Sequence, residues 1–164
     1  MNDLSHLKGT TVLVTGANGF IGSHLVDSLL SLDCNVHCLV RNSSNLRWLS
    51  SSKIQFHYVD LADPDFKIPN LPSLGFVFHC AGLTKARNRD EYFDINSRVC
   101  TTLYEQCFAY KESIKGIVHL SSLAAAGPGK DGVLVDEATT LNPITFYGQS
   151  KKAGEEVALK YSAS

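Results

Sequence analysis

A tyrosine and a lysine four residues apart form the pair with the clearest chemical potential in the sequence. They bound the run Tyr147-Gly148-Gln149-Ser150-Lys151. On a helix this spacing puts the phenol and the ammonium on one face, with Cβ atoms about 5 to 6 Å apart, so the lysine charge favours the ionised phenol. Tyr147 can then act as a general acid and base. Because the same spacing also occurs by chance in helices, a purely structural pair is the alternative.

A glycine-rich run near the N-terminus is the second such feature. It reads Gly16-Ala17-Asn18-Gly19-Phe20-Ile21-Gly22, a G-x-x-G-x-x-G pattern. Backbone N–H groups at a helix N-terminus bind a diphosphate at close range, where larger side chains would hold it away. The run therefore predicts a dinucleotide-binding loop. A tight strand-to-helix turn, in which Gly22 only allows close packing, is the alternative.

Alternating strand and helix signals must position these residues. Apolar, β-branched runs predict five strands, over 10–15, 35–40, 54–59, 76–80 and 116–120. Apolar spacing predicts helices over 21–32 and 91–110 and another from Tyr147, while prolines limit the stretch between the third and fourth strands to a short helix or a loop. Because the strand runs do not alternate with polar residues, we expect all five to be buried on both faces of a parallel sheet. The order predicts a doubly wound α/β sheet whose ligands bind beyond the carboxyl ends of the strands.

Composition limits the classes of function. The 164 residues, 44% hydrophobic and 19% charged, predict one soluble domain over residues 1–164. A net charge of -1 gives no excess positive charge for nucleic acid, and the apolar stretches are far shorter than the roughly 20 residues of a membrane span. The five cysteines form no C-x-x-C pair and the six histidines lack zinc spacing, so we expect no metal site and free thiols in a reducing cytoplasm.

The glycine run, with the preceding Thr15, resembles the cofactor fingerprint of the extended short-chain dehydrogenase/reductase family, the NAD-dependent epimerase/dehydratase group. The likeness extends from Thr11 to about Tyr161. It implies a Rossmann fold and an NAD(P)-dependent oxidoreductase or epimerase that transfers hydride between nicotinamide and a carbinol or carbonyl carbon. The implied substrate is a nucleotide sugar or a small ketone or alcohol.

The same resemblance implies the catalytic residues. Counting back five residues from Gly127 gives Ser122, which would bind the reacting oxygen together with Tyr147. Lys151 would hold the nicotinamide ribose and support the tyrosinate, and Asn96 would help to organise this region. The alternatives are a serine that caps a turn and an asparagine bonded within its own helix.

Further cofactor contacts are implied at the strand ends. Asp60 and Leu61 would contact the adenine, and the small residues Cys80-Ala81-Gly82 would lie along the cofactor. Ser121 would support Ser122 beside it. A capping role is the alternative for Asp60, and simple packing is the alternative for the small residues.

The end of the second strand bears on the choice between NAD and NADP. It reads Arg41-Asn42-Ser43-Ser44, without the acidic residue typical of NAD sites. Arg41 can bind a 2′-phosphate, and Ser43 and Ser44 can donate hydrogen bonds to it, so we expect NADP ahead of NAD. A solvated strand-end charge is the alternative for Arg41.

Two departures from the family qualify these expectations. Leu123-Ala124 stands where dehydratases have an Asp-Glu pair, so we do not expect dehydration, whereas epimerisation and reduction both stay open. Relatives continue well beyond the tyrosine helix, so we interpret the chain as cut before the substrate lobe and expect it to be poorly active alone.

Relatives also suggest a homodimer, here through the helices at 91–110 and 147–161. A function of another class stays open as well, namely a non-catalytic NADP-binding redox sensor or scaffold. Such a module needs the glycine loop but not Ser122, Tyr147 and Lys151.

Overall fold

The computed structural model describes residues 4–71, 73–129 and 134–162. The chain forms two compact units, which are described separately. The first comprises Met1–Ala81 and Glu105–Leu120, and the second comprises Gly82–Tyr104 and Ser121–Ser164.

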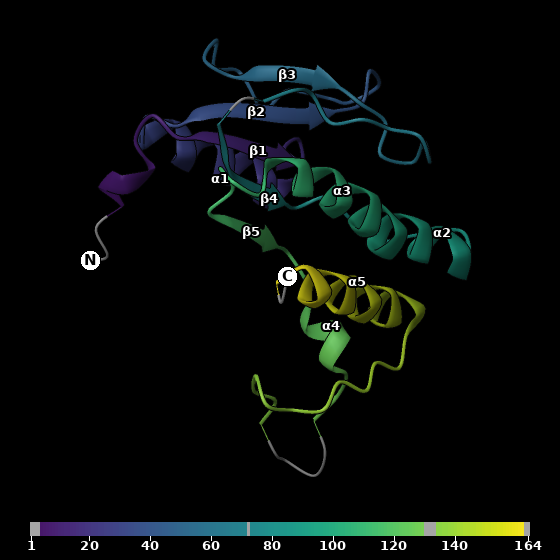
Figure 1. The fold of residues 1–164 in the computed structure, drawn as a ribbon. Helices are drawn as coiled ribbons and strands as arrows, with labels where there is room; N and C mark the ends of the chain where they lie inside the picture. Colours follow the sequence, from purple (N-terminus) through teal and green to yellow (C-terminus); the bar gives the residue numbers. More distant parts are fainter. Residues whose placement is uncertain (1–3, 72, 130–133, 163–164) are drawn as a thin grey trace. The chain divides into compact units, whose positions relative to one another are not determined.

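The first unit is built on a five-stranded parallel sheet (Figure 1). Its strands are β1 (Thr11–Thr15), β2 (Asn35–Val40), β3 (Gln55–Tyr58), β4 (Leu74–His79) and β5 (Gly116–His119). They lie in the order β3-β2-β1-β4-β5, with Val14 in register with Cys38 on one side and Phe78 on the other. This arrangement confirms the predicted parallel α/β fold of the Rossmann type, and each predicted strand lies within two residues of its observed bounds.

Helix α1 (Phe20–Ser31) packs against β1 and β2. Alternate β-branched residues of β1, Val12 and Val14, are fully buried and share a cluster with Val26 and Leu29 of the helix. Because successive side chains of a strand face opposite sides, this alternation commits one face of the sheet to α1. The helix begins at Phe20, after the short turn that follows β1.

The expectation that all five strands are buried on both faces was wrong for two of them. Tyr58 of β3 is 57% exposed and Val118 of β5 is 52% exposed. Both strands lie at the edges of the sheet, where they have a neighbour on one side only. In the sequence, the apolar run of an edge strand looks like that of a central strand. The runs therefore did not distinguish the edge strands β3 and β5 from the central ones.

The crossover between β3 and β4 contains no helix among its described residues, and Pro72 lies outside them. Side chains of residues that precede β5 hold this crossover in place by hydrogen bonds. Gln106 accepts a hydrogen bond from the Ile68 N–H (2.9 Å) and donates one to the Phe66 carbonyl (2.9 Å), and the Tyr110 hydroxyl accepts from the Leu71 N–H (3.2 Å). Of the two predicted forms, the loop is the one observed.

The helix predicted over 91–110 is interrupted. It consists of α2 (Arg89–Phe93), a π-helical turn η2 (Asp94–Arg98), α3 (Val99–Cys107) and a short 3-10 turn η3 (Phe108–Tyr110). Asn88 caps α2 by accepting from the Glu91 N–H at 2.9 Å. π-Turns of this kind occur mostly as single turns within helices and often at functional sites.

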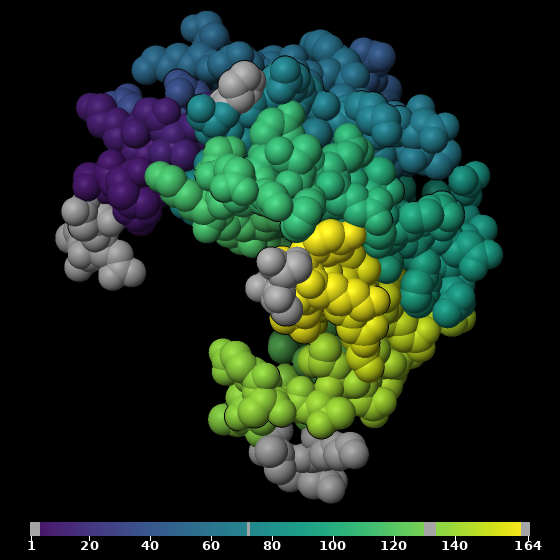
Figure 2. Space-filling model, in the orientation of Figure 1, coloured from purple at the N-terminus to yellow at the C-terminus, as the bar shows by residue number. Residues whose placement is uncertain are grey.

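The second unit also contains α4 (Leu123–Ala126), which was not predicted, and the long helix α5 (Phe146–Ser162). The two helices contact each other. Part of α5 is visible at the surface, in yellow, in Figure 2, and Leu159 on it is 66% exposed.

All five cysteines are free thiols, and all but Cys80 are buried. Burial raises the pKa of Cys38 and of Cys107 to about 12, so neither thiol is ionised near neutral pH. No helix in the described part of the chain combines the length and the apolar character needed to cross a membrane.

Candidate active site

The glycine run forms the turn between β1 and α1. Gly16 has a φ of +66°, which L side chains rarely adopt, and a Cβ on it would lie 2.6 Å from the Ala81 nitrogen. The turn therefore packs directly against the segment that follows β4. Because β1 and β4 are neighbours at the point where the strand order reverses, this is the position at which open α/β sheets bind ligands.

The start of α1 fits a diphosphate. Gly19 is the N-cap residue, and no side chain of the described residues caps the helix or places an acid in its first turn. A Cβ on Gly22 would lie 2.2 Å from the Gly16 carbonyl oxygen, so the helix and the turn approach each other as closely as backbone allows. Phe20 and Ile21 are 79% and 54% exposed, and Asn18 is half-buried. The first N–H groups of α1 thus remain available for an anion.

Thr15 and His79, whose side chains were given no predicted role, join the carboxyl ends of β1 and β4. The Thr15 hydroxyl lies 2.7 Å from Nδ1 of His79 and accepts a hydrogen bond from the Ala81 N–H at 3.2 Å. Both side chains are buried at the carboxyl ends of β1 and β4. A threonine that ends a buried strand directly before a glycine turn was the signal available in the sequence.

The other predicted cofactor residues of this unit also follow strand ends. Arg41, after β2, is exposed, and its backbone N–H donates to the Ser44 hydroxyl at 3.0 Å. Asp60, after β3, accepts from the Ala62 N–H at 3.0 Å through Oδ1. The turn-capping alternative for Asp60 therefore describes one of its oxygens, and Leu61 beside it is half-buried.

In the second unit, Asn96 lies on the π-turn η2 and its side chain leaves the helix. Its Oδ1 accepts from the Leu83 N–H (2.8 Å), and its Nδ2 donates to the Leu83 carbonyl (3.0 Å) and to the Ser150 hydroxyl (2.9 Å). The alternative of a side-chain bond within its own helix was therefore wrong. Ser150, which lies inside the Tyr147–Lys151 run, was not predicted to have a role.

Tyr147 and Lys151 occupy the first turns of α5, as predicted. Lys151 is only 4% exposed. The Tyr147 ring lies against that of Tyr92 on α2, with centroids 6.0 Å apart. The buried Cys100 nearby has its pKa raised to about 11 by burial, and the positive charge of Lys151 opposes that rise.

Ser122 is the N-cap residue of α4, and its hydroxyl accepts from the Ala124 N–H at 3.2 Å. The Ser121 hydroxyl oxygen is buried and finds no hydrogen-bond partner among the described residues. An orphaned buried hydroxyl requires an explanation, and a bound ligand supplies one. Helix α4 lies so close to α5 that a Cβ on Gly148 would stand 2.3 Å from the Ala124 carbonyl oxygen.

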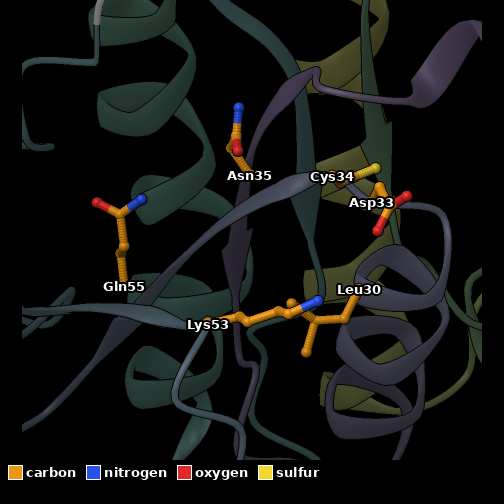
Figure 3. A pocket seen from close by; sticks show the side chains of 6 residues that line it. All are labelled: Leu30, Asp33, Cys34, Asn35, Lys53 and Gln55. Carbon is orange, nitrogen blue, oxygen red and sulfur yellow. The ribbon is translucent and has the colours of Figure 1, made fainter.

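A cavity of about 350 Å³ lies elsewhere in the first unit, at the amino ends of β2 and β3 (Figure 3). Its lining residues are Leu30, Asp33, Cys34, Asn35, Lys53 and Gln55. Because β1 to β5 are parallel, the cavity lies at the amino ends of the strands, whereas the glycine turn lies at their carboxyl ends. It contains none of the predicted site residues.

Comparison with known proteins decides the family. The model of the NAD dependent epimerase/dehydratase family matches residues 12–164. The chain belongs to this family. The resemblance drawn from the glycine run is thereby confirmed, whereas the roles of individual residues stay predictions.

Known proteins that are similar to this chain carry different names. A candidate UDP-glucose 4-epimerase of Methanocaldococcus jannaschii is 34% identical over 92% of this chain and 50% of its own length. Sterol demethylase protein B of Methylococcus capsulatus is 30% identical over 88% of this chain and 45% of its own length. Among solved structures, the UDP-glucuronic acid 4-epimerase of Bacillus cereus in complex with NAD has a TM-score of 0.77 and 26% identity, covering 94% of this chain and 53% of that one. The chain thus spans about half the length of these relatives.

Proposed function

We propose that this chain is the dinucleotide-binding part of an NAD(P)-dependent oxidoreductase or epimerase of the extended short-chain dehydrogenase type. Its substrate is a nucleotide sugar or a small ketone or alcohol. Membership of the epimerase/dehydratase family supports the general class. Similarity to relatives named for a UDP-sugar and for a sterol leaves the substrate within this range.

The observation that carries the proposal is the burial of Lys151 one helical turn after Tyr147. Lysine side chains lie mostly at the surface of proteins, whereas Lys151 is only 4% exposed. A fixed cation at this spacing stabilises a phenolate, which is the form of Tyr147 that a general base requires.

Each of the remaining residues would have one task. The N–H groups at the start of α1 bind the diphosphate, while Asp60, Leu61 and the Cys80–Gly82 segment line the cofactor. Ser122 orients the reacting oxygen with support from Ser121 beside it, and Tyr147 takes up or returns the proton of that oxygen. Lys151 binds the nicotinamide ribose, and Asn96 positions this region. A bound nicotinamide cofactor supplies hydride acceptance and donation.

Cofactor choice and assembly extend the proposal. We expect NADP to be preferred because Arg41 is exposed at the strand end, free of an adjacent acid that would repel a 2′-phosphate. A homodimer through 91–110 and 147–161 is supported by the exposed apolar Leu159 and Phe108 on those segments. The free cysteines support a reducing compartment, the cytoplasm, as the place of action.

The test is Tyr147→Phe in the full-length protein, with Tyr58→Phe as a control on an exposed tyrosine of the sheet edge. Turnover of UDP-glucose with NAD or NADP should fall by about 10²- to 10⁴-fold in the first variant, because the general acid–base group is lost. Cofactor affinity, measured by calorimetry, should be kept in both. A Tyr147→Phe variant with full turnover would contradict the role proposed for Tyr147, whereas a wild-type protein that binds the cofactor but turns over no substrate would favour the sensor or scaffold function.

A further inference from the structure

We infer that Ser150 is a positioning residue of this active site, which ties the helix turn that carries Tyr147 to Asn96. The inference rests on the proposed function, in which Tyr147 and Lys151 act on the substrate and the cofactor. It assigns a role to a residue between them whose side chain bonds to Asn96 and to the Tyr147 backbone. The four residues of the chain of contacts, including Leu83, belong to one compact unit.

The hydrogen bonds run in one direction. Leu83 presents both its N–H and its carbonyl to the Asn96 side chain, which fixes the oxygen of that amide on the N–H and its nitrogen on the carbonyl. The amide nitrogen therefore donates to the Ser150 hydroxyl, at 2.9 Å. Since the Ser150 hydroxyl accepts this bond, it can donate its single proton elsewhere. It donates to the Tyr147 carbonyl oxygen at 2.7 Å.

Because these hydrogen-bonding groups are buried, the loss of one leaves its partner unsatisfied. Ser150 is fully buried and Asn96 is 1% exposed, so water does not replace a lost partner. Without the hydroxyl, one donor of the Asn96 amide is left unsatisfied, and that costs more than an ordinary hydrogen bond contributes. The first turn of α5 also loses its tie to η2.

This series of hydrogen bonds lies beside groups that take part in the proposed reaction. A Cβ on Gly82 would lie 3.1 Å from Asn96 Oδ1 and 3.8 Å from the Lys151 ammonium. Asn96 thus touches the segment predicted to lie along the cofactor, and Ser150 connects that segment to the turn bearing Tyr147. A displacement of about 1 Å in such a turn is enough to slow catalysis by up to about 10²-fold.

Deuterium uptake tests the connection without a substrate. Ser150→Ala should raise uptake in peptides containing Leu83 as well as in those covering the first turn of α5, and Ser150→Thr, which keeps the hydroxyl, should restore both. Ser113→Ala is the matched control, because Ser113 also donates to the carbonyl three residues before it in a turn outside this unit. A serine that only satisfies its own helix would leave the Leu83 peptide unchanged, and that result would overturn the inference.

Kinetics of the full-length protein test the consequence, with UDP-glucose and NAD or NADP as probes. Ser150→Ala should lower kcat by about tenfold or more while KM changes little, and Ser150→Thr should recover most of kcat. If Tyr147→Phe abolishes turnover but Ser150→Ala keeps the wild-type kcat, this inference alone fails. If Tyr147→Phe keeps its turnover, the proposed function fails. Should the wild-type protein not convert UDP-glucose, the deuterium uptake at Leu83 decides for or against Ser150.

Discussion

Gly22 lies against the Gly16 carbonyl oxygen so closely that a Cβ on Gly22 would stand 2.2 Å from it. Real Cβ atoms do not approach an oxygen to this distance, so a side chain at Gly22 forces either the turn or the first turn of α1 to move. The contact therefore sets the position of the N–H groups proposed to bind the diphosphate.

Gly22→Ala should weaken dinucleotide binding by about tenfold or more and lower stability by about 1 to 3 kcal/mol, the usual cost of overpacking. Calorimetric titration with NADPH and thermal unfolding measure the two effects. Gly116→Ala is the control, because a Cβ there meets only the Phe76 ring at an ordinary 3.4 Å. Wild-type affinity in Gly22→Ala would show that this approach is not needed for binding.

Gly148→Ala should reduce turnover and stability together. The added Cβ would stand 2.3 Å from the Ala124 carbonyl and 3.0 Å from the Pro143 Cβ, so α5 must move away from α4, whose first residue follows Ser122. We expect kcat to fall by about tenfold or more, because Tyr147 and Ser122 would no longer meet one oxygen. Gln149→Ala, in the same turn, should leave steady-state kinetics unchanged; an equal loss in both variants would argue against the contact.

Arg41→Ala should separate the two cofactors. Loss of a charge-assisted hydrogen bond to the 2′-phosphate predicts a rise of about tenfold or more in the Kd for NADPH, with the Kd for NADH unchanged. Arg47→Ala is the reference, since Arg47 lies over the Trp48 ring, 4.6 Å from its centroid. Equal effects of Arg41→Ala on NADPH and NADH would contradict the proposed preference.

Stability should fall as the pH falls below about 6.5, because of a histidine pair on β2 and β3. Nδ1 of His37 lies 2.9 Å from Nε2 of His57 in stacked rings. Burial first, and then the neighbouring His57, lower the pKa of His37 from its usual 6.5, and burial lowers the pKa of His57. The unfolded chain thus takes up protons at a pH where the folded chain does not. The contribution of the neutral histidine pair to the free energy of unfolding is therefore complete above pH 6.5 and is lost as the pH falls below it.

Denaturant titrations across this pH range measure the effect. His57→Gln should flatten the decline of the free energy of unfolding with falling pH, because it removes one group that binds a proton more readily in the unfolded chain. His24→Gln, on the exposed side of α1, should leave the slope as it is. A slope unaltered by His57→Gln would assign the pH dependence to other groups.

Local features of the chain were predictable to within a few residues. The strands and α1 follow from apolar runs and helical spacing, which need only neighbours in the sequence. The π-turn at Asp94–Arg98 was not predictable from the sequence. It carries Asn96, whose side chain bonds to Leu83 and to Ser150, and Ser150 is 54 residues away. Helix α4 was missed as well, since four residues carry too little periodicity to indicate a helix.

The sequence by itself determined the order of the elements, the glycine turn, the spacing of Tyr147 and Lys151, and the family to which they point. All of these depend on residue types along continuous segments. Only the tertiary structure decided that β3 and β5 are edge strands, that Thr15 and His79 join the ends of β1 and β4, and that Ser150 links Asn96 to Tyr147. Burial and hydrogen-bond partners are set by segments distant in the chain, and no local spacing encodes which of them will meet.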